Sequence, residues 1–257
     1  MPVIDRIADF IDDLVAIRRD LHENPELGME EVRTSAIVAE LLNKWGVTTH
    51  TGIGNTGVVG VLKGKGAGRT IGLRADMDAL PIHEKTNLPF ASKTPGIMHA
   101  CGHDAHTTML LGAARYLAET QQFDGTAVFI FQPAEEGLGG ARAMLADSLF
   151  DRFQCDEIYG MHNMPNGKPG TVGVKPGEAM AGADFFDITI KASGSHAAMP
   201  HQSIDPIVIG SALVQQLQSI VSRNVPPTSP LVLSVTQMHA GAAYNVIPSQ
   251  CIISGTM

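Results

Sequence analysis

The sequence contains few cysteines, no basic cluster and no long hydrophobic run. Its three cysteines, Cys101, Cys155 and Cys251, argue against a disulfide framework and favour a reducing compartment, so we expect a cytoplasmic protein. No stretch of 18 apolar residues occurs, so we predict no membrane span, and the first 20 residues lack the apolar core of a signal peptide. The formal net charge is -8, which argues against a nucleic-acid partner.

The sequence has the apolar content and periodicity of a folded globular chain, because 44% of its residues are hydrophobic and 17% are charged. Apolar residues recur at helical spacing in four segments, which predicts helices at about residues 3–17, 30–45, 107–121 and 140–146. Short apolar runs between these segments predict strands at residues 56–62, 70–75, 127–131 and 157–161. The alternation of strands and helices indicates an α/β fold with a largely parallel sheet.

A glycine- and proline-rich segment, residues 167–177, is typical of a connector between domains. The pattern after it predicts a small α+β domain, with a helix at residues 207–221 and strands at residues 185–190, 231–235 and 251–254. We therefore expect two domains, residues 1–181 and residues 182–257, and we expect the sequence to end inside the second domain.

The nine residues from Met98 to His106 combine three histidines, a cysteine and an aspartate. Imidazole and thiolate are preferred ligands of divalent metals such as zinc, and Cys101 and His103 have the spacing that places two side chains on one side of an extended segment. We expect both ligands in a loop at a helix N-terminus, where backbone N–H groups lower the pKa of a thiol. The alternative is a solvated, histidine-rich turn.

Three predicted strands each end in residues of the kinds that ligate metals or transfer protons: Asp76 and Asp78, Glu135 and Glu136, and His162. In a parallel sheet the carboxyl ends of the strands meet at one edge, which is where ligands bind. The side chains of adjacent residues diverge, so one glutamate can bind metal while the other accepts a proton from water. The alternatives are an acidic turn, an aspartate that caps backbone N–H groups, and a surface histidine.

Taken together, five motifs resemble the metallopeptidase family of aminoacylases, bacterial carboxypeptidases and hippurate hydrolases, in its amidohydrolase branch. They cover the chain in order: LRADMDALP at residues 73–81, MHACGHD at 98–104, PAEEG at 133–137, HNMP at 162–165 and GSHAAMPH at 194–201. The resemblance implies a two-metal, aminopeptidase-like catalytic domain with an inserted α+β lid or dimerisation domain. It also implies a small-molecule substrate and a homodimer or higher homo-oligomer formed through the lid.

The same resemblance assigns roles to individual residues. It implies four metal ligands, Cys101, His103, Glu136 and His162, and it implies that Glu135 is the general base. Asp76 falls at the position of the catalytic-site aspartate, with Asp78 a close competitor. His196, which composition alone would leave in a surface loop, resembles a lid histidine that steadies the substrate.

We therefore expect a metal-dependent amidohydrolase that cleaves N-acyl amino acids or related small acylated compounds, with two divalent ions per subunit, zinc or else manganese, cobalt or nickel. The alternatives are a dipeptidase or carboxypeptidase, or a metal-binding fragment without catalysis. Members of the family continue past the position of Met257 and supply one more histidine ligand there. We accordingly expect this chain to be a truncated product with weak activity or none.

Overall fold

The computed structural model describes residues 4–257, which fall into two compact units, residues 4–171 and residues 172–257. The predicted boundary between residues 181 and 182, and the catalytic and lid roles of the two domains, stay predictions. In the described part of the chain, no helix has both the length and the apolar character needed to cross a membrane.

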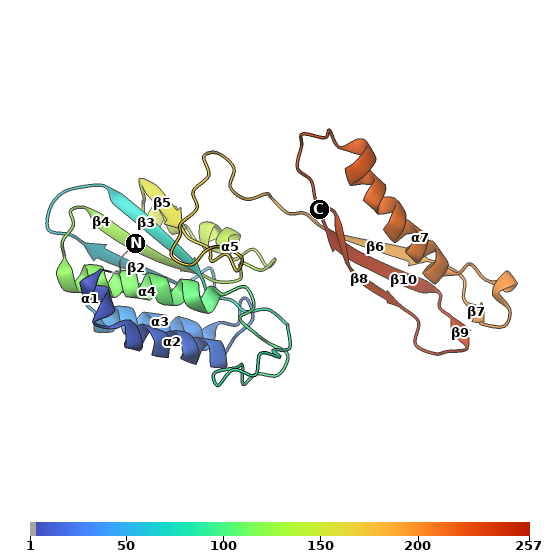
Figure 1. Cartoon of the computed structure of the whole chain (residues 1–257), viewed down its shortest axis with the longest axis horizontal. Helices are drawn as coiled ribbons and strands as arrows, with labels where there is room; N and C mark the ends of the chain where they lie inside the picture. The colour runs from blue at the N-terminus through green and yellow to red at the C-terminus, as the bar shows by residue number, and fades with distance from the viewer. Residues whose placement is uncertain (1–3) are drawn as a thin grey trace. The chain divides into compact units, whose positions relative to one another are not determined.

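A five-stranded sheet organises the first unit (Figure 1). Its order is β1-β2-β4-β3-β5, built from β1 (Thr48–Ile53), β2 (Gly57–Lys63), β4 (Thr126–Gln132), β3 (Thr70–Asp76) and β5 (Glu157–Gly160). Strand β3 runs parallel to both β4 and β5, whereas β2 is antiparallel to β1 and β4. The α/β class is thus confirmed, with a mixed sheet that is parallel in the part that carries the predicted site residues.

Helices cover the two faces of this sheet unequally. Three helices lie on one face: α2 (Ile11–Glu23), α3 (Val32–Lys44) and α4 (His103–Thr120). Two short helices, α5 (Gly140–Ala146) and α6 (Leu149–Arg152), contribute to the core on the other face. Alternate residues of β4 serve the two cores, because Phe129 and Phe131 pack toward α3 and α4 while Val128 and Ile130 pack toward α5 and α6. Burial on both faces explains why β4 is a continuous apolar run.

Most predicted elements of the first unit are confirmed. The differences lie at the N-terminus, in β1, in α6, which was not predicted, and at the start of α4, which begins at His103 and not at residue 107. The single helix predicted at residues 3–17 is divided into two helices, α1 (Asp5–Ala8) and α2. Its predicted first residue, residue 3, lies outside the described residues. Strand β1 was not predicted, because its sequence, TTHTGI, has no apolar run; it forms by antiparallel pairing with β2.

The second unit contains a three-stranded antiparallel sheet of order β6-β10-β8, with helix α7 (Pro206–Ser219) packed on it (Figure 1). Its strands are β6 (Phe185–Lys191), β8 (Ser234–Ala240) and β10 (Gln250–Thr256). The predicted α+β pattern is present, but the strand expected at residues 231–235 begins three residues later, at Ser234. Pro230, which cannot donate a backbone hydrogen bond to a sheet, lies just before the predicted start. Smaller elements complete the unit: β7 (Ser195–His196), β9 (Val246–Ile247), a 3-10 turn (Pro200–Gln202) and a π-helical turn (Ile220–Asn224).

Candidate metal centre

The parallel strands bring the predicted site residues to one edge of the sheet. Asp76 is the last residue of β3 and lies opposite Gln132, the last residue of β4, while Arg74 lies opposite Gly160 at the end of β5. The segments that follow these strands therefore start side by side. Asp78, the glutamate pair and His162 all lie on these segments, which is the arrangement that the sequence predicted.

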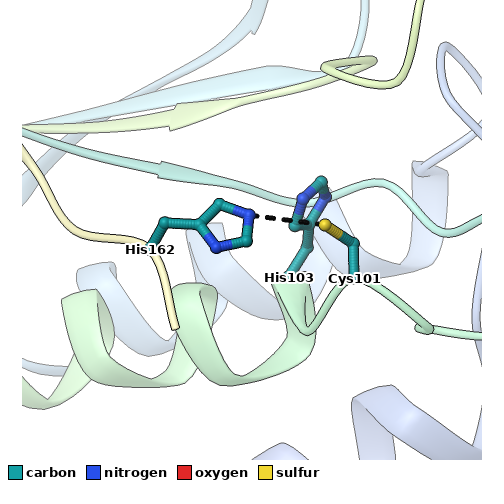
Figure 2. Close-up of side chains that lie close together, drawn as sticks. All are labelled: Cys101, His103 and His162. Carbon is teal, nitrogen blue, oxygen red and sulfur yellow. Dashed lines mark hydrogen bonds between the residues drawn. The ribbon is translucent and has the colours of Figure 1, made fainter. Parts of the chain in front are cut away.

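Figure 2 shows that Cys101, His103 and His162 face one another. One ligand atom from each lies within 4.8 Å of the other two, and the Cys101 Sγ is 3.3 Å from the Nε2 of His162. Helix α4 begins at His103, so this residue is in the first turn of the helix while Cys101 lies in the preceding loop. The prediction that both residues lie in a loop is therefore confirmed for Cys101 and wrong for His103. Gly102 joins them at φ 96°, and a Cβ there would approach the side-chain oxygen of Asn163 to 2.6 Å, so this bend needs glycine.

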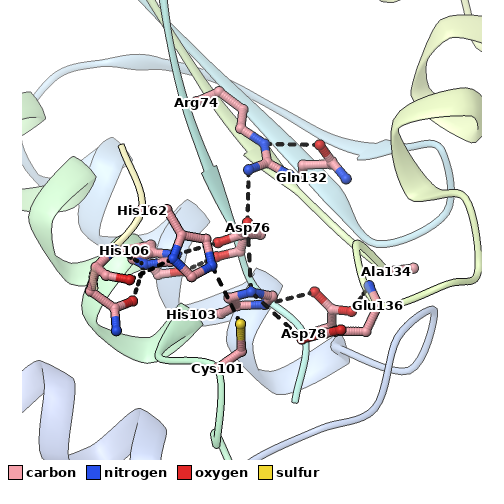
Figure 3. A network of polar contacts seen from close by, with 12 residues as sticks. Arg74, Asp76, Asp78, Cys101, His103, His106, Gln132, Ala134, Glu136 and His162 are labelled. Carbon is pink, nitrogen blue, oxygen red and sulfur yellow. Dashed lines mark hydrogen bonds and ion pairs between the residues drawn. The ribbon is translucent and has the colours of Figure 1, made fainter. Parts of the chain in front are cut away.

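His103 is the centre of the arrangement (Figure 3). It belongs to three groups of residues whose possible ligand atoms lie close together. Its companions in these groups are Cys101 and His162, Asp76 and His106, and Glu135 and Glu136. Its Nε2 is buried without a hydrogen-bond partner and lies 4.0 Å from a carboxylate oxygen of Glu136.

Hydrogen bonds behind the two candidate histidine ligands set the direction in which they present their lone pairs. The Nδ1 of His103 donates to Asp78 over 3.1 Å, which leaves Nε2 as the free atom. His162 is fixed in the same way, because its Nδ1 lies 2.7 Å from the carbonyl oxygen of Asn163, an acceptor, so Nε2 is the nitrogen that faces Cys101. Imidazoles held by an acceptor on one nitrogen are typical of metal ligands.

The two aspartates are both buried but have different neighbours. Asp78 also accepts the backbone N–H of Glu136 over 2.9 Å. One carboxylate therefore links His103 to the turn that carries Glu135 and Glu136, which we call the glutamate turn. Asp76 accepts from the Nδ1 of His106 over 2.6 Å and pairs with Arg74 over 2.7 Å. Burial alone would raise the pKa of Asp76, but the His106 hydrogen bond and the Arg74 charge outweigh it and lower the pKa to about 2. Which aspartate is the catalytic-site residue stays a prediction.

Two residues that the sequence analysis left without a role complete this network. His106 lies one helical turn after His103, and its Nε2 accepts the backbone N–H of Asn163 over 3.1 Å and also contacts the Asn163 side chain. The chain Asp76–His106–Asn163 therefore supports the loop that carries His162. The spacing of three residues from His103 was the available signal, since it places both histidines on one helix face.

The electrostatics of the centre favour a cation. The expectation that the helix N-terminus lowers the pKa of Cys101 is wrong: burial, followed by the charge of Glu136, raises that pKa to about 12. Without a cation the thiol therefore stays protonated among carboxylates. A divalent ion would reverse this, because a coordinated thiol loses its proton. The donor set of one sulfur, two imidazoles and a carboxylate, together with the unpartnered His103 Nε2, fits a metal of the zinc class.

His196 lies in the second unit, apart in sequence from the metal centre. It forms part of the short β7–β9 pairing opposite Val246, and its Nδ1 accepts the backbone N–H of Ala198 over 3.1 Å. The ring belongs to an exposed residue. Its predicted contact with substrate stays a prediction.

Comparisons with known proteins identify the family that this chain resembles. The model of "Peptidase family M20/M25/M40" matches residues 72–256. The hippurate hydrolase of Campylobacter jejuni is 50% identical over 248 residues, which are 96% of this chain and 64% of that protein. The N-acetyl-L-cysteine deacetylase of Bacillus subtilis is 46% identical over 95% of this chain and 58% of its own length. The chain thus spans less than two thirds of the length of either relative.

A solved structure also matches both in fold and in sequence. It is the YXEP protein of Bacillus subtilis, described as a dinuclear metal-binding peptidase of the M20 family. The TM-score is 0.72 and the sequence identity 41%, over 97% of this chain and 64% of the other.

Proposed function

The chain belongs to peptidase family M20/M25/M40, and from this membership we propose that the protein is a metal-dependent amidohydrolase that cleaves the amide bond of N-acyl amino acids or related small acylated compounds. The observation that carries the proposal is the convergence of cysteine, histidine and glutamate side chains around His103, whose buried Nε2 has no hydrogen-bond partner. The names of two relatives, a hippurate hydrolase and an N-acetyl-L-cysteine deacetylase, support the acylated substrate class.

In this proposal Cys101, His103, Glu136 and His162 hold divalent metal, with two ions per subunit in the full-length family. A bound ion would supply Lewis acidity, which polarises an amide carbonyl and makes water more acidic. Zinc suits the donor set, and manganese, cobalt and nickel are the other candidates.

Glu135 would act as the general base. It is adjacent in the chain to Glu136 and belongs with it to a group of possible ligands around His103, but it is exposed, so it can meet water and substrate. Its carboxylate would accept the proton of the attacking water and then deliver it to the nitrogen of the leaving amine. Asp78 would keep His103 and the glutamate turn in position through its two hydrogen bonds, and Asp76 would keep His106 in position through its own.

We further propose that the second domain, residues 182–257, is the lid and mediates a homodimer in which His196 steadies the substrate. Three free cysteines support a cytoplasmic location.

The role of His196 is testable by mixing two inactive variants, Glu135→Gln and His196→Ala, of the full-length protein. If the histidine serves the neighbouring subunit, mixed dimers recover part of the activity; no recovery after demonstrated subunit exchange would contradict this.

The test of the function combines metal analysis with a substrate panel on the same purified sample. We expect bound divalent metal and faster hydrolysis of hippurate and N-acetylated amino acids than of dipeptides. A preference for dipeptides would favour a dipeptidase or carboxypeptidase instead, and metal without turnover would favour a metal-binding fragment.

Two glutamate variants test the division of roles. Glu135→Gln should retain metal and lose turnover by several orders of magnitude, since it removes proton transfer, whereas Glu136→Gln and Cys101→Ala should lose metal. Equal metal content in all three variants would leave the assignment of base and ligands without support.

A further inference from the structure

Glu31 is a fully buried carboxylate outside the metal centre. It is the residue immediately before α3, with 0% of its surface exposed. Its side chain makes no hydrogen bond that caps the helix. Glu26 takes that task, because its two carboxylate oxygens accept the backbone N–H groups of Arg33 and Thr34 over 2.9 and 2.8 Å. The Glu31 carboxylate is therefore available for other partners.

Its two partners lie on other elements of the first unit. One oxygen of Glu31 accepts the backbone N–H of Ala134 over 2.7 Å, and the other accepts the hydroxyl of Thr56 over 2.6 Å. Burial raises the pKa of Glu31, opposed by the hydrogen bond from Thr56. A carboxylate in this setting costs free energy unless its hydrogen bonds are made, and each oxygen of Glu31 has a partner.

Ala134 is the partner that lies nearest in the chain to the glutamate pair. It immediately precedes Glu135 and Glu136, and its φ of 47° places a non-glycine residue in the left-handed region. Such a conformation persists only where the surroundings hold it. Besides the Glu31 hydrogen bond, the carbonyl of Ala134 accepts the N–H of Gly140 over 2.9 Å, and Asp78 accepts the N–H of Glu136.

Two glycines, Gly28 and Gly140, pack closely against this turn. A Cβ on Gly28 would lie 3.0 Å from both the Cα and the Cβ of Ala134, and a Cβ on Gly140 would lie 1.7 Å from the carbonyl oxygen of Pro133. The segment before α3 is joined to the end of β3 as well, because Ala79 donates its N–H to Glu26 over 2.8 Å. The segment that carries Glu31 thus contacts both strand-end segments that build the metal centre.

We propose that Glu31 is a positioning residue, whose carboxylate holds the Ala134 N–H and thereby aims Glu135 and Glu136 at the metal centre. The inference rests on the proposed metal centre. Removal of the acceptor would leave the Ala134 amide unsatisfied in the interior, and the turn would relax from its left-handed conformation. Glu136 would then lose its alignment with His103, while Cys101 and His162, which lie on other segments, would keep theirs.

The test is a Co²⁺ titration of the 257-residue chain, followed by visible and near-ultraviolet absorption. Glu31→Met removes both acceptor oxygens at similar volume, and we expect it to raise the Co²⁺ dissociation constant roughly 10- to 100-fold, the usual effect of losing a contact behind a metal ligand. The ligand-field bands, which report the coordination geometry, should change, whereas the thiolate charge-transfer band from Cys101 should persist. Glu31→Gln retains an oxygen for Ala134 and should bind Co²⁺ nearly as the wild type does.

Thr56→Val is the matched control, because it removes the other hydrogen bond of the same carboxylate and leaves the one to Ala134. We expect a lower melting temperature with wild-type Co²⁺ affinity and spectrum. Equal weakening in Thr56→Val and Glu31→Met would show general damage to the fold, and wild-type binding by folded Glu31→Met would overturn the proposal directly.

Two further outcomes are distinguishable. If the wild type fails to bind Co²⁺, the proposed metal centre fails and this inference fails with it; if the wild type binds and the Glu31 variants match it, only the inference fails. Should Glu31→Met not fold, Glu31→Asp replaces it, since its carboxylate is one methylene too short to keep the Ala134 contact. Wild-type Co²⁺ affinity in that variant would overturn the proposal equally.

Discussion

Replacing Asp78 with asparagine should weaken metal binding while preserving the shape of the side chain. In the native chain one oxygen of Asp78 accepts from the Nδ1 of His103 over 3.1 Å, and the other accepts from the backbone N–H of Glu136 over 2.9 Å. Both partners are donors, whereas an amide offers one acceptor and one donor. The substituted asparagine therefore cannot satisfy both contacts in either orientation.

The two orientations fail for different reasons. With its oxygen toward His103, the amide would direct its NH₂ at the Glu136 N–H, and two buried donors would face each other at a cost of about 1–3 kcal/mol. With its NH₂ toward His103, the amide would require an unprotonated Nδ1, and the ring proton would move to Nε2, the atom that would bind metal. Either result predicts a loss of metal affinity of roughly 10- to 100-fold, which is about 1.4–2.7 kcal/mol.

The assay is competition for Zn²⁺ against a chromophoric chelator, with circular dichroism to confirm folding. Asp104→Asn is the matched control: Asp104 is also a buried carboxylate bonded to a histidine, but its partner is His22, over 2.8 Å, which is not one of the proposed ligands. We expect that variant to lose stability and to keep its affinity for Zn²⁺. A folded Asp78→Asn variant with wild-type affinity would refute the reasoning.

Two further predictions concern stability. Gly140→Ala should destabilise the chain by at least about 3 kcal/mol in urea unfolding, because its Cβ would fall 1.7 Å from the Pro133 carbonyl oxygen; Gly173→Ala, whose Cβ meets nothing within 4 Å, is the control and should change little. The pKa of His22 is raised by its hydrogen bond to Asp104, against the effect of burial. The stabilisation is therefore complete below the ordinary pKa of 6.5 and is lost as the pH rises through the raised value in the folded state. His22→Gln should flatten this part of the pH dependence of the free energy of unfolding, and an unchanged profile would contradict it.

Secondary structure with a strong local signal could be predicted from the sequence. Strand β4 is a continuous apolar run because both of its faces are buried, and α3 follows helical spacing, so each element carries its own pattern. Strand β1 has no such pattern and depends on pairing with β2, a contact that no local window contains. Strand β8 begins later than predicted for a related reason. The apolar residues before it, near Pro230, do not pair with the neighbouring strand.

The candidate ligands could be predicted because their chemistry is local: cysteine and histidine two residues apart, and a carboxylate pair after a strand. The sign of the pKa shift of Cys101 could not, because it depends on burial and on Glu136, a residue 35 positions away in the chain. The supporting role of His106 likewise becomes visible only when Asn163 is placed beside it.

The sequence by itself determined the element types, the α/β class and the identity of the ligand candidates, since propensity, periodicity and donor chemistry belong to residues and their near neighbours. Tertiary structure alone decided which nitrogen of His103 is free, that Asp78 joins His103 to the glutamate turn, and that Glu31 holds Ala134 instead of capping its own helix. The physical reason is that hydrogen bonds and burial act over a few ångströms in space, whatever the separation along the chain. Glu31 and Ala134 are 103 residues apart, and only folding places them 2.7 Å from each other.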